Sequence, residues 1–166
     1  MNGPVECMVG VGSNLGDPVR QVSQALQDLQ FLPDCRLLAT SGLYHNPPVG
    51  PPDQPDYVNA VARLQTGLSP HALLASLQTL EQAAGRQKTR SWGERILDLD
   101  LLVYGDLSMD DPQLTLPHPE IAQRRFVLVP WLEIAPDAAL PDGQSLAELL
   151  VSAPPHPLER LAFGAA

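Results

Sequence analysis

The run Leu97-Asp98-Leu99-Asp100-Leu101 alternates apolar and acidic residues. This period of two is typical of a β-strand, in which the two aspartates share one face and the leucines share the other. Two carboxylates at this spacing lie about 6–7 Å apart along the backbone and repel each other unless a cation lies between them. The pattern therefore predicts a site for a hard metal ion such as Mg²⁺. The alternative is an edge strand whose acidic face is simply solvated.

The few basic residues of the chain gather beside this pair. Ten residues are Lys or Arg, and four of them lie just before the aspartates: Arg86, Lys88, Arg90 and Arg95. The net charge of −9 argues against a nucleic acid or an acidic membrane as a partner. Cations next to a metal-binding carboxylate pair are instead what a magnesium–polyphosphate complex requires. The pattern indicates phosphoryl transfer, although each Arg could also be an ordinary surface charge.

Length and composition predict a single domain over residues 1–166 with a substantial hydrophobic core. No apolar run approaches the roughly 20 residues that span a bilayer, and the first residues lack the features of a signal peptide. Cys7 and Cys35 show no CxxC or zinc-binding spacing and lie in apolar segments, so we expect buried, reduced thiols. These features predict a cytoplasmic protein.

The elements that must position the aspartates alternate between strands and helices. Apolar patterns predict strands over residues 6–12, 35–44, 57–64 and 96–103. Helical spacing after an N-cap residue and a proline predicts helices over residues 18–32 and 70–84. The order β-α-β-β-α-β predicts an α+β fold, the ferredoxin-like sandwich, with an antiparallel sheet and both helices on one face.

The C-terminal third adds further elements to this core. An amphipathic stretch over residues 120–134 and a short helix over 146–151 could cover the second face of the sheet. The tail over residues 153–166 is the least defined segment and could be partly disordered. Five prolines within residues 46–56 predict a stiff loop that could form a preformed wall of a binding site.

The turn from Gly12 to Gly16 follows a predicted strand and precedes a predicted helix, as phosphate-binding loops do. It lacks the Gly-Lys-Ser/Thr of a P-loop, and Leu15 stands where the third glycine of GxGxxG would be. We interpret it as a tight structural turn, so an ATP site must be built from other residues.

Several separate motifs occur in an order and spacing that together are specific. They are Gly12-Ser13-Asn14-Leu15-Gly16, the block from Tyr44 to Asn59, Leu80-Glu81-Gln82-Ala83-Ala84-Gly85-Arg86, the segment from Trp92 to Asp100, Leu116-Pro117-His118-Pro119, and Arg124-Arg125-Phe126-Val127-Leu128. With these motifs the chain, from about Val5 to Gly143, closely resembles the 6-hydroxymethyl-7,8-dihydropterin pyrophosphokinases of folate biosynthesis. The fold of that family is the ferredoxin-like sandwich.

The resemblance implies that ATP gives its β,γ-diphosphoryl group to the hydroxymethyl oxygen of the pterin and that AMP is released. It also implies two Mg²⁺ ions, ligated by Asp98 and Asp100. No unattached general base is apparent in the sequence, so positioning and charge neutralisation are expected to supply most of the rate. We expect small-molecule substrates and a monomer.

Matching positions assign individual residues, and each assignment is implied by the resemblance. The catalytic group comprises Arg86, Trp92, Arg95, Asp98 and Asp100, and Trp92 would lie on a loop that closes over the substrates. The ATP-binding group comprises Gln78, Glu81, Arg86, Lys88, Trp92, Arg95, Leu101, Thr115, His118 and Arg124. The pterin-binding group comprises Gly12, Asn46, Pro47, Val49, Tyr57, Asn59 and Phe126. As alternatives, His118 could form a rigid turn, and Tyr57 and Phe126 could be core residues.

The chain departs from the family pattern at several positions. Lys88 stands where many relatives carry Arg, Gln113 where some carry Arg, and Asn46 where others carry Thr. The segment over residues 87–91 is one residue shorter than in some members. Because the aspartates themselves are intact, we expect an active enzyme. Two other functions remain open: a magnesium-dependent kinase that releases ADP, and a catalytically silent module that binds a pterin or a nucleotide.

Overall fold

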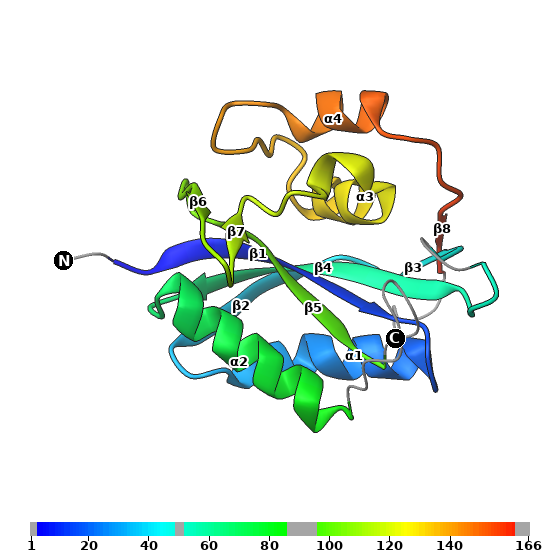
Figure 1. The fold of residues 1–166 in the computed structure, drawn as a ribbon, viewed down its shortest axis with the longest axis horizontal. Coiled ribbons are helices and arrows are strands. Elements are labelled where there is room, and N and C mark those ends of the chain that lie inside the picture. Colours follow the sequence, from blue (N-terminus) through cyan, green and yellow to red (C-terminus); the bar gives the residue numbers. More distant parts are fainter. Residues whose placement is uncertain (1–2, 49–51, 86–95, 162–166) are drawn as a thin grey trace.

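A computed structural model describes residues 3–48, 52–85 and 96–161, which form three layers (Figure 1). One layer contains the helices α1 (Pro18–Asp28) and α2 (Pro70–Ala83). The middle layer is an antiparallel sheet. The third layer contains the helices α3 (Arg125–Ile134) and α4 (Leu146–Ser152). None of the helices in these residues is long and apolar enough to cross a membrane.

The central strand of the sheet is β1 (Val5–Ser13), which lies between β4 (Tyr57–Thr66) and β5 (Asp98–Tyr104). The other edge of β4 pairs with two short strands, β2 (Cys35–Thr40) and β3 (Tyr44–Asn46). The strand order β5-β1-β4-β2, with α1 and α2 on one face, is that of the predicted ferredoxin-like sandwich. The predicted fold class is confirmed.

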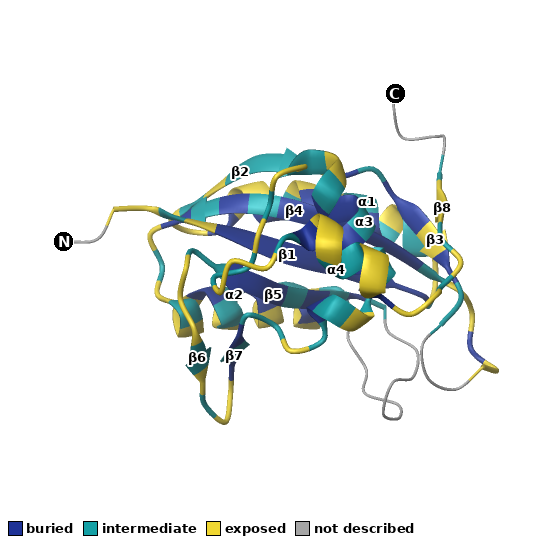
Figure 2. Ribbon diagram, turned by 90° about the horizontal axis from the view of Figure 1, so that it is seen from above, coloured by how far each residue is buried: buried dark blue, intermediate teal, exposed yellow. Residues whose placement is uncertain are grey.

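Each face of the sheet packs against its own hydrophobic core. Alternate residues of β1 show this division: Val9 and Val11 pack under α1 and α2, whereas Met8 packs with Trp131 and Leu128 of α3. Figure 2 shows the buried strands beneath α3 and α4. The prediction that C-terminal helices cover the second face is therefore confirmed.

The sequence predicted the beginnings of α1 and α2 more accurately than the other helix boundaries. Asp17 and Ser69 cap these helices through their side chains, and a proline follows each cap. The first helix ends at Asp28 and continues as a 3₁₀ turn, η1 (Leu29–Phe31). The stretch over residues 120–134 is not one helix, because a separate 3₁₀ turn, η2 (Ile121–Gln123), precedes α3.

The strand predicted over residues 35–44 was wrong in its extent, because the chain leaves the ladder between β2 and β3. The Ser41 hydroxyl accepts a hydrogen bond from the backbone N–H of Val61 at 2.9 Å, in place of a ladder carbonyl. The backbone N–H of Gly42 donates to the Glu133 carboxylate of α3 at 3.0 Å. Both are long-range contacts that a local sequence pattern does not contain.

Two short elements were not predicted from the sequence. The hairpin of β6 (Met109–Asp110) and β7 (Thr115–Leu116) forms a small second sheet beside β5. The strand β8 (Glu159–Arg160) pairs with β3 and so joins the tail to the main sheet. Of the tail over residues 153–166, the structure describes residues 153–161.

Candidate active site

The aspartates of β5 lie on the face of the sheet that carries α3. Burial alternates along this strand, and Leu99 and Leu101 enter the core on the opposite face. The backbone neighbours of Asp98 and Asp100 on β1 are Gly12 and Gly10. Because glycine has no side chain, these two positions of β1 place no side chain of their own beside the carboxylates.

Asp100 has two potential phosphate-binding side chains beside it. The Arg124 guanidinium lies 3.4 Å from Asp100 Oδ2, and His118 Nε2 lies 4.0 Å from Oδ1. The predicted grouping of Arg124 and His118 with the aspartates therefore agrees with the geometry. Arg124 also lies over the Phe126 ring, 5.7 Å from its centroid, and so contacts a residue predicted to bind the pterin.

The His118 ring is held in one orientation by the backbone. Its Nδ1 accepts a hydrogen bond from the N–H of Glu120 at 3.1 Å, so in the neutral ring the proton is on Nε2, which faces Asp100. The backbone N–H of His118 donates to the Leu102 carbonyl at 2.8 Å. Burial, together with the charge of Arg124, lowers the pKa of His118 below 6.5. At neutral pH the ring is thus a directed hydrogen-bond donor and not a charge.

The predicted pterin-binding residues meet on the other side of Gly12. In the β1–β4 register Gly12 lies opposite Asn59, and the Asn59 amide nitrogen donates to Asn46 Oδ1 at 2.6 Å. The Asn59 oxygen is consequently turned over Gly12, where it lies 2.6 Å from the position that a Cβ atom would occupy. The Tyr57 ring is also beside Gly12, with Cδ1 3.7 Å from that position. The structure thus groups Gly12, Asn46, Tyr57 and Asn59.

The arrangement places two kinds of site on one surface. Asp98 and Asn59 occupy the strands on either side of Gly12, so their backbones are about 10 Å apart. A carboxylate pair with cationic neighbours lies on one side of Gly12, and an amide with a tyrosine ring lies on the other. Groups suited to a charged ligand and groups suited to a flat polar ring therefore lie on one surface.

The carboxylate pair fits the chemistry of Mg²⁺. Within the described residues no group of three or more His, Cys, Asp or Glu side chains could hold a metal ion. Magnesium is commonly bound by one or two carboxylates together with substrate phosphates and water, and does not need a complete protein cage. Asp98 and Asp100 could supply hard oxygen ligands of this kind, and their neighbours on β1 are both glycines.

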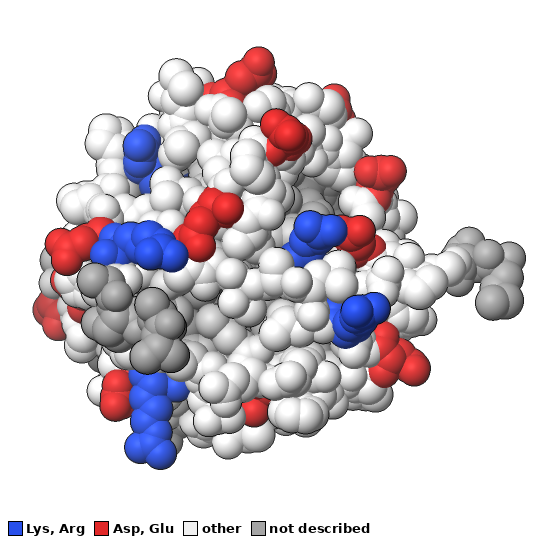
Figure 3. Space-filling view, turned by 180° about the vertical axis from the view of Figure 1, so that it is seen from behind, with Lys and Arg blue, Asp and Glu red and all other residues white. Residues whose placement is uncertain are grey.

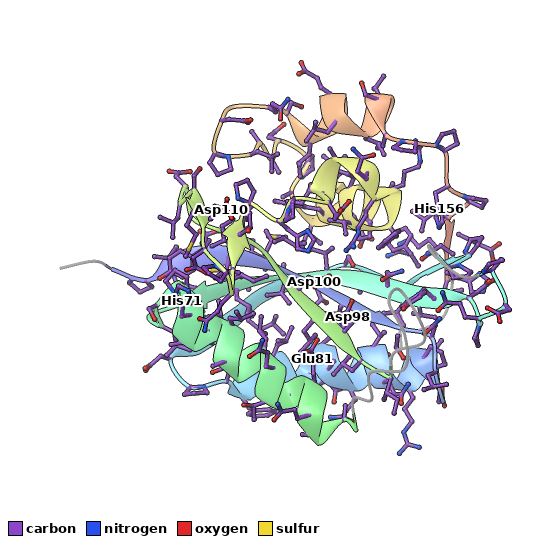
Figure 4. All side chains as sticks on the ribbon, in the orientation of Figure 1. His71, Glu81, Asp98, Asp100, Asp110 and His156 are labelled. Carbon is purple, nitrogen blue, oxygen red and sulfur yellow. The ribbon has the colours of Figure 1, made fainter. Side chains whose placement is uncertain are left out.

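Four residues predicted to bind ATP lie away from this surface or use their side chains elsewhere. The Leu101 side chain is 2 % exposed in the core on the opposite face, so only its backbone could line a site. Glu81 is 2 % exposed and accepts a hydrogen bond from the Leu99 N–H at 2.8 Å, which ties α2 to β5. Figure 4 shows it between α2 and the sheet. Gln78 is exposed on α2, and the Thr115 hydroxyl donates to Asp110.

Six residues singled out from the sequence lie outside the described residues. They are Val49, Arg86, Lys88, Arg90, Trp92 and Arg95. Their assigned roles stay predictions, as does closure of a loop over the substrates.

The structure also identifies supporting residues that the sequence did not indicate. The buried Asn14 amide donates to Gln54 Oε1 and to the Pro55 carbonyl, both at 2.9 Å, and so joins the turn after β1 to the proline-rich loop. The interpretation of this turn as structural agrees with these contacts. Asn14 belongs to a quoted motif, but its partners lie about forty residues away, so spacing alone could not reveal them.

A second polar cluster joins α3 to the sheet edge next to Asn46. The Glu133 carboxylate accepts hydrogen bonds from the Tyr44 hydroxyl at 2.6 Å and from the Gly42 N–H, and it pairs with Arg160 of β8 at 3.4 Å. Burial alone would raise the pKa of Glu133, but these donors outweigh burial and hold the pKa below 4.5. Burial and the adjacent carboxylate raise the pKa of Tyr44 to about 12.

We expect Glu133→Gln to destabilise the protein by about 1 kcal/mol at pH 7, a value reduced for the partial exposure of this cluster. A carboxyl group whose pKa is lowered on folding contributes stability above its unfolded pKa, and this contribution is lost as the pH falls through the folded pKa. The difference from wild type should therefore narrow as the pH falls below 4.5. Urea denaturation across pH 3–7 measures this difference in the free energy of unfolding, and the exposed Glu159→Gln serves as the control. A difference that stays the same at every pH would contradict the prediction.

Comparison with known proteins identifies the family of the chain. The family model described as 7,8-dihydro-6-hydroxymethylpterin-pyrophosphokinase (HPPK) matches residues 8–136. The chain belongs to this family. A Haemophilus influenzae member, named 2-amino-4-hydroxy-6-hydroxymethyldihydropteridine pyrophosphokinase, is 45 % identical over 95 % of this chain and 98 % of its own length. A Pseudomonas aeruginosa member with the same name is 47 % identical over 92 % and 94 % of the two chains.

A solved structure extends the similarity to the HPPK fold. The wild-type HPPK-DHPS of Plasmodium falciparum with pteroate superposes with a TM-score of 0.69 at 12 % identity. The match covers 92 % of this chain and 43 % of the other, so the present chain spans less than half of that protein. At this identity the likeness establishes the HPPK fold, whereas the bacterial relatives establish membership of the family.

Proposed function

We propose that this HPPK-family protein transfers the β,γ-diphosphoryl group of ATP to the hydroxymethyl oxygen of 6-hydroxymethyl-7,8-dihydropterin. The observation that carries the proposal is the placement of Asp98 and Asn59 on either side of Gly12. This placement would bring the polyphosphate and the pterin to one surface. A bond forms between the pterin oxygen and the β-phosphorus, the bond from that phosphorus to the α,β-bridging oxygen breaks, AMP leaves, and the hydroxyl proton passes to solvent.

The polyphosphate side of the reaction is assigned to Asp98, Asp100, His118 and Arg124. The two carboxylates would hold two Mg²⁺ ions, which when bound neutralise the phosphate oxygens and favour attack on the β-phosphorus. Arg124 would release Asp100 and bind phosphate oxygens, and the neutral His118 would donate from Nε2. Arg86, Lys88 and Arg95 would add further positive charge. Catalysis would come mainly from positioning and charge stabilisation.

The pterin side of the reaction is assigned to Gly12, Asn59, Tyr57 and Phe126. Gly12 lets the Asn59 amide and the Tyr57 ring approach the β1 backbone closely. Tyr57 and Phe126 would contact the pterin through their aromatic faces. The Asn59 oxygen is fixed as an acceptor because its amide nitrogen is engaged by Asn46. An acceptor at this position suits the N–H edge of a pterin.

The decisive experiment mixes the protein, Mg²⁺, ATP and the reduced hydroxymethylpterin and identifies the nucleotide that is released. We expect AMP in an amount equal to the pterin diphosphate. Release of ADP would instead indicate a kinase that transfers one phosphoryl group. Binding of both ligands with no product would indicate a silent binding module, and the intact aspartates argue against this alternative.

The remaining expectations concern the setting in which the enzyme works. We place it in the cytoplasm, as a monomer with reduced cysteines, acting on small molecules. On the face of the described structure drawn in Figure 3, the basic side chains are scattered, most of them beside an acidic one. That face has no continuous basic strip, in keeping with substrates other than a nucleic acid.

A further inference from the structure

The C-terminal segment brings a histidine to the predicted pterin pocket. His156 lies between α4 and β8, more than a hundred residues from Asn46 and Pro47, yet its Nε2 is 2.8 Å from the Pro47 carbonyl oxygen and 3.3 Å from the Asn46 amide nitrogen. Its ring centroid is 5.9 Å from that of Phe126, with a tilt of 56° between the planes. Figure 4 shows His156 on the α3 side of the sheet, near the end where β8 joins β3.

The chemistry of these partners fixes the role of the ring. A carbonyl oxygen only accepts hydrogen bonds, so His156 Nε2 carries the proton and donates to Pro47. The Asn46 amide nitrogen donates to the same carbonyl at 2.9 Å, and its oxygen accepts from Asn59. The hydrogen bonds therefore run from His156 to Asn59 through Pro47 and Asn46, and they end at the acceptor that lies over Gly12.

The position of His156 is secured by its neighbours in sequence. Glu159 and Arg160 pair with His45 and Tyr44 as β8, and the backbone N–H of Leu161 donates to the Leu43 carbonyl at 2.8 Å. The Arg160 ion pair with Glu133 adds a side-chain attachment to α3. The ring is thus delivered to the pocket by ordered backbone pairing.

We infer that His156 is a positioning residue for the pterin, acting through the Pro47 carbonyl and the Phe126 ring. It fixes the polar wall formed by Asn46 and Asn59 and the aromatic surface of Phe126, so that the ring of the substrate meets a preformed pocket. The inference rests on the proposed function and assigns to the tail a part in substrate recognition. Because the hydrogen-bond contacts of His156 are with Pro47 and Asn46, on the pterin side of the site, it should not affect ATP.

Three substitutions distinguish the hydrogen bond of His156 to Pro47 from its ring contact with Phe126. His156→Ala removes both, His156→Phe keeps a ring beside Phe126 without the donor, and His156→Gln keeps an N–H that can reach Pro47. Calorimetry with the reduced hydroxymethylpterin, in the presence of Mg²⁺ and α,β-methylene ATP, measures the pterin Kd. We expect His156→Ala to raise this Kd roughly 5–10-fold, with smaller effects of the other two variants. The KM for ATP should stay unchanged.

The neighbouring Glu159→Ala, which removes an exposed side chain from the same segment, serves as the matched control and should leave the pterin Kd unchanged. Thermal unfolding of each variant reports on the fold. An unchanged pterin Kd in His156→Ala would overturn the inference, as would equal weakening of pterin and ATP with a lowered Tm. Failure of the proposed function is distinct, because the wild-type protein itself would then release no AMP.

Discussion

Asp98→Ala and Asp100→Ala should each lower turnover by about 10³-fold or more at saturating Mg²⁺ and ATP. With the proposed metal site, each variant would lose one of the two carboxylate ligands of β5, and the polyphosphate would keep its charge at the reacting phosphorus. The loss should appear in kcat, measured as AMP released per enzyme. Near wild-type activity in both variants would contradict the metal assignment.

The same substitutions should leave the fold intact. The side chains of Asp98 and Asp100 lie outside both hydrophobic cores, and two like charges on one strand face repel each other in the absence of a cation. Asp98→Ala should therefore still unfold cooperatively as a folded protein, as measured by thermal unfolding. Asp100→Ala also loses its contact with Arg124 and should change the free energy of unfolding by no more than about 1 kcal/mol. Asp106→Ala, on an exposed turn after β5, is the matched control with normal activity.

The part of the site that could be predicted from the sequence follows from local periodicity. Alternation along β5 correctly placed Asp98 and Asp100 on one face, because a strand directs successive side chains to opposite sides whatever the rest of the fold does. The same rule places the Leu101 side chain on the other face, so only the backbone of Leu101 could take part in the predicted ATP binding.

The features that escaped prediction depend on contacts between distant segments. Glu81 was assigned to ATP binding by its motif position, but α2 turns Glu81 into the core, where it accepts a hydrogen bond from the Leu99 N–H. A buried backbone donor needs a partner, and only the packing of α2 on β5 reveals which residue supplies it. In the same way, the strand break at Ser41 depends on its hydrogen bond with Val61. The position of His156 depends on its hydrogen bond with Pro47. Local patterns carry no information about such partners.

Gly12→Ala is expected to weaken pterin binding by roughly 10–100-fold, although it adds only one methyl group. The new Cβ would lie 2.6 Å from Asn59 Oδ1, which is shorter than any tolerated contact, so the amide must move. Asn59 cannot rotate freely, because its nitrogen donates to Asn46 at 2.6 Å. The substitution therefore displaces the Asn59 oxygen, the acceptor that would bind the pterin.

A neighbouring glycine and a double variant separate this clash from a general effect of alanine in β1. At Gly10 an added Cβ would meet only ordinary contacts, the nearest 3.7 Å away on Leu102, so Gly10→Ala should leave the pterin Kd within about two-fold. Asn59→Ala should itself weaken binding, since it removes the acceptor. In the double variant Gly12→Ala/Asn59→Ala the clash is absent. Its loss of pterin binding free energy should therefore be well below the sum of the losses in the two single variants. Additive losses, measured by calorimetry with α,β-methylene ATP and Mg²⁺, would mean that Gly12 acts on the pterin independently of Asn59.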